Sequence, residues 1–304
     1  MNVGNEKRAL IFDIKRDCSE DGPGIRTTVF FKGCPLSCIW CQNPEGKLHQ
    51  PQLSYQENLC SPLICNSACT KICPENCLQI SPVNKLSIDH ERCTMCNKCI
   101  EVCPTHALEP VGYWIGLEEL LYRVCIDKPF YQSTGGGVTL SGGEVTQQMD
   151  FAGEFLTQLK EQAIHTAIET SGFFNYQQFT NKMLAYLDLI YFDLKLYSEE
   201  ESRKYTGQSN ALIMENFKKL INEPNVTVIP RIPLIPGITT KPDNLQAISR
   251  LLKELGVNNA VLLPYNPLWQ DKSKKLSIKP RYNRTTFMNE DEKDNCVRIF
   301  YEKS

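Results

Sequence analysis

Three cysteines close together in the chain could hold an iron–sulfur cluster. Cys34, Cys38 and Cys41 are separated by three and two residues in the run CPLSCIWC. Three thiolates on one short loop can bind three irons of a four-iron cubane and leave the fourth iron open to a substrate. A structural zinc site would need four protein ligands, and the nearest histidine in sequence is His49. The spacing therefore favours a catalytic cluster with one open iron over zinc.

Two further groups of cysteines have the spacing of a ferredoxin and look like an internal duplication. Cys93, Cys96, Cys99 and Cys103 are spaced by two, two and three residues and are followed by Pro104, which matches the bacterial ferredoxin motif. Cys60, Cys65, Cys69 and Cys73, followed by Pro74, form a looser copy. In two-cluster ferredoxins the fourth cysteine of each run ligates the other cluster. We therefore expect two four-iron clusters, one held by Cys60, Cys65, Cys69 and Cys103 and the other by Cys93, Cys96, Cys99 and Cys73.

The remaining four cysteines are interpreted as ordinary small residues. Cys77 falls where the second copy has Ala107, in the pairing CPENCL with CPTHAL, so a buried thiol is favoured over a ligand. Cys18, Cys125 and Cys296 receive the same interpretation. A disulfide framework is the alternative for all 15 cysteines, but such frameworks belong mostly to short secreted domains.

The elements that must position these groups alternate between strand and helix. Apolar runs predict strands at 27–31, 137–140, 166–169, 189–193, 226–231 and 260–263. Helical patterns lie between them at 117–127, 151–162, 176–186, 211–222 and 244–255. Six β–α alternations predict an α/β fold with a parallel barrel or open barrel, formed by residues 1–51 and 113–304. Residues 52–112 are the cysteine-rich insert.

Reactive residue types fall at the carboxyl ends of the predicted strands, where the chemistry of a parallel barrel gathers. The segments are Ser141–Glu144, Glu169–Gly172, Asp193–Lys195, Arg231–Pro233 and Pro264–Asn266. A Gly-Gly pair is often only a turn, and Asp193 and Lys195 could simply pair with each other. The functional alternative is a ligand that approaches the glycines, with Glu144 accepting from an ammonium group and Lys195 neutralising a carboxylate. Glu169, Thr170 and Asp193 could also bind a cation.

Charge and length exclude several classes of protein. The 304 residues contain 33 Lys and Arg against 35 Asp and Glu, so nothing in the net charge points to nucleic acid or an anionic membrane. The apolar run near the N-terminus is too short for a signal peptide, and no stretch reaches the roughly 18 apolar residues of a membrane span. We expect a soluble, cytoplasmic protein that acts as a monomer.

Together these residues resemble the radical S-adenosylmethionine superfamily, whose signature loop has the Cys34, Cys38 and Cys41 pattern with an aromatic residue before the last cysteine. Within it, the chain resembles the activating enzymes of glycyl radical enzymes. The run DGPGIRT at 21–27 precedes the loop, the paired insert follows it, and Ser141–Glu144, Asp193–Lys195 and Arg231–Gly237 come in order. The resemblance implies a partial (β/α)6 TIM-like barrel of the radical SAM type with a ferredoxin-like two-cluster insert.

The resemblance also implies a reaction. A reduced cluster at Cys34, Cys38 and Cys41 binds S-adenosylmethionine at its open iron and donates an electron to the sulfonium, which gives methionine and a 5′-deoxyadenosyl radical. That radical removes a hydrogen atom from a backbone glycine of a partner glycyl radical enzyme. A flavodoxin or ferredoxin would supply the electron, and exposed four-iron clusters suggest an anaerobic host.

Residue roles follow from the same resemblance. Asp21 would lie where the partner's glycine loop enters, and Lys195 would belong to the catalytic site. Trp40 and Gln42 would lie along the adenosyl group, although Trp40 could equally be core. The other expected contacts to S-adenosylmethionine are Gly142, Gly143 and Glu144 at the amino group, Thr170, Asp193, Leu194 and Lys195 at the carboxylate and a monovalent cation, and Arg231.

The chain departs from its relatives in one place and leaves two other functions open. Many relatives have a histidine where this chain has Asn266, which can hydrogen-bond a ribose but cannot carry a proton. A radical S-adenosylmethionine enzyme that acts on a small molecule or peptide is one alternative function. An electron-transfer module, with the insert as its working part, is the other. The basic segment at 272–281 could dock a partner or simply be a solvated surface.

Overall fold

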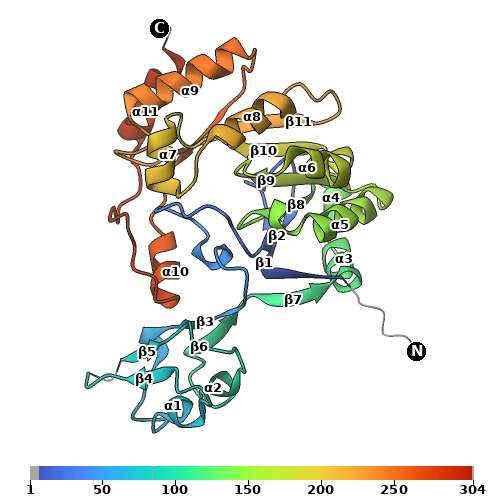
Figure 1. The fold of residues 1–304 in the computed structure, drawn as a ribbon. Helices are drawn as coiled ribbons and strands as arrows, with labels where there is room; N and C mark the ends of the chain where they lie inside the picture. Colours follow the sequence, from blue (N-terminus) through green and yellow to red (C-terminus); the bar gives the residue numbers. More distant parts are fainter. Residues whose placement is uncertain (1–6, 84, 303–304) are drawn as a thin grey trace.

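An open eight-stranded sheet forms the larger part of the chain (Figure 1). The computed structural model describes residues 7–83 and 85–302. Neighbouring strands follow the order β12-β11-β10-β9-β8-β2-β1-β7. The strands are β1 (Arg8–Cys18), β2 (Arg26–Phe31), β7 (Tyr113–Gly116), β8 (Gly137–Gly142), β9 (His165–Thr170), β10 (Leu189–Asp193), β11 (Thr227–Leu234) and β12 (Val261–Pro264). The six strands from β2 to β12 pair in parallel, which confirms the α/β class.

Helices cover the sheet and follow its strands. The main ones are α3 (Leu117–Cys125), α4 (Lys128–Thr134), α5 (Met149–Glu161), α6 (Tyr176–Lys182), α7 (Glu199–Thr206), α8 (Ala211–Leu220), α9 (Pro242–Glu254), α10 (Trp269–Lys275) and α11 (Glu290–Tyr301). Helix α5 buries Phe151, Phe155 and Leu159, whose spacing of four places them on one face. These side chains belong to the main core, together with Val138 and Leu140 of β8, and α5 lies against β9 and β1. Because β2 and β8 are buried on both faces, their sequences are almost continuously apolar or small.

All six predicted strands are present, but the sheet has two more. Strand β1 runs antiparallel to β2, and β7 runs antiparallel to β1, so the sheet extends beyond a simple β–α repeat. Helices α4, α7, α10 and α11 were also absent from the prediction. No helix in the described ranges 7–83 and 85–302 is both long and apolar enough to cross a membrane.

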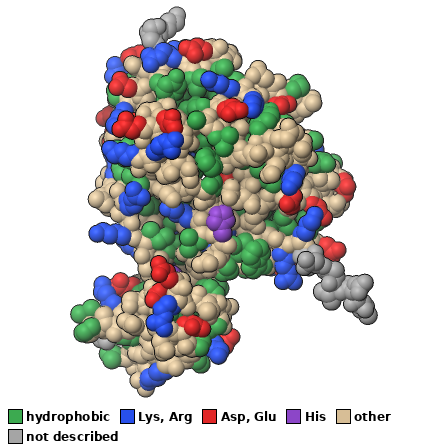
Figure 2. All heavy atoms as spheres, viewed as in Figure 1, with side chains coloured by type: hydrophobic (Ala, Val, Ile, Leu, Met, Phe, Trp, Pro, Cys, Tyr) green, Lys and Arg blue, Asp and Glu red, His purple; other side chains and the backbone are tan. Residues whose placement is uncertain are grey.

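The insert forms a separate lobe below the main body (Figures 1 and 2). Strands β3 (Gln52–Tyr55) and β6 (Leu108–Val111) pair antiparallel where the insert leaves and rejoins the sheet. Within the lobe, β4 (Leu78–Ile80) pairs with β5 (Leu86–Ile88), and the short helices α1 (Ala68–Ile72) and α2 (Lys98–Glu101) lie close together. The two halves correspond, since Cys69 lies on α1 and Cys99 on α2. Both cysteines belong to a small apolar core with Leu53 and Leu108.

Candidate functional site

The loop with three cysteines follows β2 and is held by backbone hydrogen bonds on two sides. Cys34 N donates to Lys47 O over 3.1 Å, which closes the loop on itself. Ser37 N donates to Thr206 O at 2.6 Å, and Ile39 N donates to Tyr205 O at 3.1 Å, so the end of α7 supports the other side. Cys34, Cys38 and Cys41 are each half-buried. The sheet and α7 therefore fix the path of the loop at the carboxyl ends of the strands.

The environment of these thiols suits a positively charged metal cluster. Burial raises the pKa of Cys38 to about 11, with Lys195 acting in the opposite direction. Burial also raises the pKa of Cys34 and of Cys41. Metal-binding thiols must be deprotonated, so iron binding here releases their protons. The positive charge of the iron then stabilises the buried thiolates. The donor set of three sulfurs on one rigid loop fits a cubane that keeps one iron open.

Gly142 and Gly143 bring the end of β8 against this loop. Gly143 N donates to Phe31 O, and Glu144 N donates to Gly33 O, both at 2.8 Å. A Cβ on Gly143 would collide with the carbonyl oxygens of Gly33 and Gly46, and Gly142 has a φ of +117°. The close approach that the Gly-Gly pair permits is therefore an approach of the protein's own backbone. A ligand contact at these glycines remains a prediction.

Glu144 joins the ends of β8 and β9. Its side chain is 1% exposed. Oε1 accepts from Thr170 Oγ1 at 2.8 Å and from Thr146 Oγ1 at 2.8 Å, while Oε2 accepts from Ser171 N at 2.8 Å and Ser171 Oγ at 2.6 Å. Thr146 N adds a fifth donor at 3.3 Å. These donors use most of the carboxylate's accepting capacity, so its main structural role is to hold Thr170 and Ser171 in place.

Charged side chains from three neighbouring strands form one network. Arg231 of β11 donates to Glu169 of β9 and, through Nε, to Asp193 Oδ1 of β10 at 3.1 Å. Lys195 Nζ donates to Asp193 Oδ2 at 2.9 Å, and Ser141 Oγ donates to Glu169 Oε2 at 2.5 Å. Burial acts to raise the pKa of Asp193, but Lys195 and Arg231 hold it below its usual value. Asp193 and Lys195 do pair, as one interpretation of the sequence had it.

The same network bears on the predicted cation. Two of its three expected ligands, Glu169 and Asp193, already face positively charged groups. The third, Thr170, donates its hydroxyl proton to Glu144. A monovalent cation here remains a prediction and would have to share these carboxylates with Arg231 and Lys195.

Trp40 and Leu194, two of the predicted cofactor residues, are buried. Trp40 is 3% exposed and packs with Leu196, Ile235 and Trp269, which agrees with the core interpretation of this side chain. The Leu194 side chain is fully buried, and its N–H donates to Arg231 O. A stacking contact between Trp40 and an adenine stays a prediction.

The structure brings Gln42 and Asn266 together from distant parts of the chain. Gln42 Nε2 donates to the backbone carbonyl of Asn266 at 3.1 Å. Asn266 Oδ1 accepts from Leu268 N at 2.8 Å, and Lys272 Nζ reaches Asn43 Oδ1 at 3.3 Å. Lys272, the first residue of the basic segment at 272–281, therefore contacts the chain directly after the cysteine loop.

Asp21 lies in the loop between β1 and β2 and contacts positions of β2 and β8 that precede the carboxyl ends near the cysteine loop. Its Oδ2 accepts from Thr28 Oγ1 at 2.6 Å, and its backbone carbonyl accepts from Thr139 Oγ1 at 2.7 Å. Thr139 is two residues before Ser141, about 7 Å along a strand.

Two residues near the level of Thr139 were not selected from the sequence. Arg26 is fully buried and donates to Thr139, and the ring of Tyr191 lies 4.9 Å from the Arg231 guanidinium. Tyr191 precedes Asp193 by two residues, so both side chains lie on the same face of the strand. This alternation could have identified Tyr191 from the sequence.

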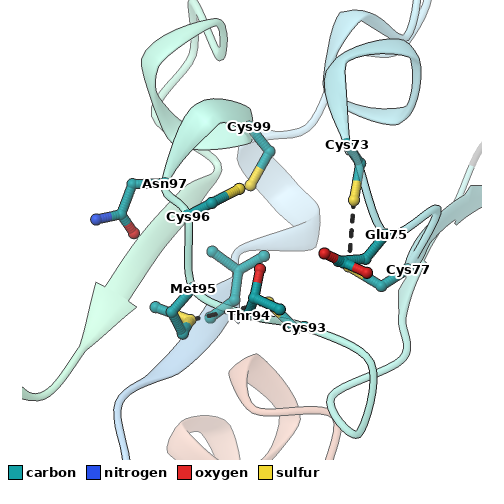
Figure 3. A pocket seen from close by; sticks show the side chains of 10 residues that line it. Cys73, Glu75, Cys77, Cys93, Thr94, Met95, Cys96, Asn97 and Cys99 are labelled. Carbon is teal, nitrogen blue, oxygen red and sulfur yellow. Dashed lines mark hydrogen bonds between the residues drawn. The ribbon is translucent and has the colours of Figure 1, made fainter.

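The insert cysteines gather into two groups. One cavity is lined by Cys73, Cys77, Cys93, Cys96 and Cys99, together with Glu75 and Met95 (Figure 3). The other group consists of Cys60, Cys65, Cys69 and Cys103. Burial and, to a smaller extent, the nearby thiols of Cys65, Cys60 and Cys103 raise the pKa of Cys69 to about 11. Burial tends to raise the pKa of Cys73, but backbone N–H groups of Cys77, Glu75 and Asn76 and the Cys77 thiol lower it overall. Within the described residues, no three His, Cys, Asp or Glu side chains are placed so that they could bind one metal ion. A four-iron cluster does not require such a group, because each thiolate binds a different iron.

Comparison with known proteins points in one direction. Residues 86–109 match a family model described as "4Fe-4S binding domain", and residues 20–80 match one described as "4Fe-4S single cluster domain". The isethionate sulfite-lyase activating enzyme of Oleidesulfovibrio alaskensis is 38% identical, covering 86% of this chain and 85% of that protein. The trans-4-hydroxy-L-proline dehydratase activating enzyme of Clostridioides difficile is 36% identical, covering 96% and 95%. The pyruvate formate-lyase 2-activating enzyme of Escherichia coli is 35% identical, covering 88% and 81%.

Proposed function

Because this chain belongs to the activating enzymes of glycyl radical enzymes, within the radical S-adenosylmethionine family, we propose that its cysteine loop and strand ends generate the radical that activates a partner enzyme. The family assignment carries with it iron–sulfur clusters and S-adenosylmethionine as cofactors. The observation that carries the proposal for individual residues is the position of the cysteine loop. It lies directly against the end of β8, with the Asp193–Lys195–Arg231 network on the neighbouring strands.

A cluster held by Cys34, Cys38 and Cys41 would supply one electron to the sulfonium of S-adenosylmethionine, whose cleavage to methionine and a 5′-deoxyadenosyl radical would allow removal of a hydrogen atom from the partner's glycine. We assign Cys34, Cys38 and Cys41 as the ligands of this cluster. The protein's contribution is to hold the three thiols on a rigid loop and to exclude water from the reacting atoms.

The strand-end residues are proposed to bind S-adenosylmethionine. Lys195 and Arg231, which share the carboxylates of Asp193 and Glu169, are proposed to donate hydrogen bonds to the carboxylate of S-adenosylmethionine. Gly142 and Gly143 are proposed at the amino group, with Glu144 holding Thr170 and Ser171 beside it. Gln42 and Asn266, which are hydrogen-bonded to each other, are proposed along the adenosyl group, with Trp40 beneath the loop.

The finer description of the fold is part of the proposal. The six parallel strands from β2 to β12 form the partial (β/α)6 barrel, made by residues 1–51 and 113–304. Residues 52–112 form a ferredoxin-like domain with two further four-iron clusters, which makes three clusters in all. The duplicated arrangement of α1 with Cys69 and α2 with Cys99 supports this assignment.

The partner is a glycyl radical enzyme, as the names of the relatives indicate. Those relatives are named for different lyases and dehydratases. We propose that Asp21, which contacts Thr28 of β2 and Thr139 of β8, faces the entering glycine loop, and that a flavodoxin or ferredoxin delivers electrons to the insert. We also propose that the enzyme acts as a monomer.

One experiment tests the reaction directly. The enzyme with reconstituted clusters, incubated anaerobically with dithionite and S-adenosylmethionine, should form 5′-deoxyadenosine, and Cys38→Ala should not. Addition of the glycyl radical enzyme encoded beside it should then produce a glycine-centred doublet in electron paramagnetic resonance. Cofactor cleavage without that doublet for every plausible partner would favour a small-molecule or peptide substrate. No cleavage at all would favour an electron-transfer protein.

A second experiment addresses the insert. Cys93→Ala combined with Cys96→Ala should slow activation of the partner when a flavodoxin or ferredoxin is the reductant. Binding of S-adenosylmethionine at the Cys34 loop should change little, because the lobe is separate from that loop. Unchanged activation would mean that the insert has a structural role only.

A further inference from the structure

One insert cavity contains five thiols, one more than a four-iron cluster binds. Cys73, Cys77, Cys93, Cys96 and Cys99 all line it (Figure 3). Four of these are the proposed ligands, so Cys77 is the additional thiol. It is 4% exposed, and its Sγ lies 3.3 Å from the Sγ of Cys73. Cys77 is thus buried against a proposed ligand, within the layer of residues that would surround the cluster.

The short distance between the two sulfurs decides what Cys77 can do. Each cysteine of a cubane binds a different iron on its outward side, so two ligands of one cluster lie well beyond van der Waals contact. Cys73 and Cys77, at 3.3 Å, cannot both be ligands. Cys73 occupies the position before proline that the ferredoxin motif reserves for a ligand. A ligating Cys73 is a thiolate and can only accept, which makes the Cys77 thiol the donor.

The second half of the insert has no equivalent thiol. Ala107, 1% exposed, takes the place of Cys77, and both residues come directly before the leucine that begins a strand, Leu108 and Leu78. Near Cys103, the counterpart of Cys73, the nearest side-chain donor is the hydroxyl of Thr105 at 3.7 Å. The position therefore needs only a small buried side chain, and packing alone does not account for a thiol there.

We propose that Cys77 is a tuning residue, which donates an S–H···S hydrogen bond to the ligating sulfur of Cys73 and makes that insert cluster easier to reduce. The inference rests on the proposed assignment of Cys73, Cys93, Cys96 and Cys99 to one cluster. Reduction adds negative charge to the cluster and its sulfurs, and a hydrogen-bond donor stabilises the more negative state. The carboxylate of Glu75, which lines the same cavity, acts in the opposite direction.

The test is a redox titration of the full-length protein with all clusters reconstituted, followed by electron paramagnetic resonance and by visible absorption. Cys77→Ala should leave the iron content per chain unchanged. At a fixed potential near the midpoint it should lower the ratio of reduced to oxidised cluster by about fivefold, the size expected for the loss of one ordinary hydrogen bond. A tenfold change would correspond to 59 mV for one electron.

Three further variants serve as controls. Cys77→Ser keeps a donor at the same place and should restore the ratio. Cys296→Ala removes a buried thiol from the main core and should leave the titration unchanged. Glu75→Gln should raise the ratio, which establishes that the measured signal belongs to this cluster.

Two results would overturn the proposal. An unchanged titration in Cys77→Ala, with the expected shift in Glu75→Gln, would mean that Cys77 does not tune the cluster. Loss of about four irons in Cys77→Ala, with iron retained in Cys73→Ala, would make Cys77 the ligand. Absence of iron from the insert of the unmodified protein would instead refute the cluster assignment itself, so the two failures are distinguishable.

Discussion

The side chain of Gln42 donates a hydrogen bond to the backbone carbonyl of Asn266 over 3.1 Å and so joins the cysteine loop to the segment after β12. Gln42→Glu removes the donor but keeps the shape of the side chain. We expect binding of S-adenosylmethionine to weaken about fivefold, which corresponds to about 1 kcal/mol, while the iron content stays constant. Equilibrium binding measured anaerobically checks this. Lys274→Met, which removes an exposed pair with Asp271, is the control and should bind normally.

Replacement of Gly143 tests whether the end of β8 fixes the cysteine loop. Gly143→Ala places a methyl group against the carbonyl oxygens of Gly33 and Gly46, so the loop must move away. We expect loss of the cluster at this loop, about four irons per chain, with the insert clusters retained. At Gly237 an added Cβ meets no atom, although its φ is +75°, so Gly237→Ala should cost about 1 kcal/mol and keep the iron. Equal iron content in the two variants would contradict the prediction.

Glu144 should contribute to stability as much as to binding. Glu144→Gln places an NH2 group among donors from Thr146, Thr170 and Ser171, so one or two of those donors lose their acceptor. We expect a loss of about 1–3 kcal/mol in the free energy of unfolding, measured by denaturant titration. If Glu144 instead served only to accept from the ammonium group of S-adenosylmethionine, stability would be unchanged and affinity alone would fall.

His165 should make stability depend on pH in the weakly acidic range. Burial, together with the adjacent Arg26, lowers the pKa of His165 below 6.5, and Arg26 Nη1 lies 3.3 Å from its Nδ1. The unfolded chain then binds this proton more readily than the folded chain. The free energy of unfolding therefore falls as the pH drops from about 6.5 toward the folded pKa, and this residue has no effect above that range.

Substitution of the histidine isolates this contribution. His165→Gln should reduce the slope of stability against pH below about 6.5, measured by thermal or denaturant unfolding. His90, whose pKa is also lowered by burial, keeps its own contribution in both proteins, so the difference between them reports His165 alone. Identical slopes would contradict the assignment.

The sequence predicted the parallel strands, including β12 at one edge of the sheet, but missed β1 and β7 at the other edge. The runs at 189–193 and 137–140 are apolar because β10 and β8 are covered by helices, and this cause acts locally. Strand β1 has apolar residues at Ala9, Leu10 and Ile11 but exposed charges further on, and its place in the sheet depends on pairing with Trp114 and other residues of β7. Pairing between distant segments leaves no periodic signal in either one.

The candidate site was predicted in its residue types but not in its internal contacts. The spacing of Cys34, Cys38 and Cys41 and the strand-end positions of Glu144, Asp193 and Lys195 were all visible in the sequence. Glu144 accepts from Thr170 and Ser171, and Arg231 donates to both Glu169 and Asp193; these contacts depend on the register between strands. Register follows from the packed sheet, so no single segment contains it.

The position of the insert between two paired strands also governs the order in which the protein can fold during synthesis. Strand β1 is made first, yet its partner β7 leaves the ribosome only after the whole cysteine-rich lobe has emerged. The edge of the sheet therefore closes across a long loop, which is slow to form because of the entropy of chain closure. The whole lobe is synthesised before strands β8 to β12 of the parallel sheet exist, so its cysteines emerge while most of the catalytic half is still being translated.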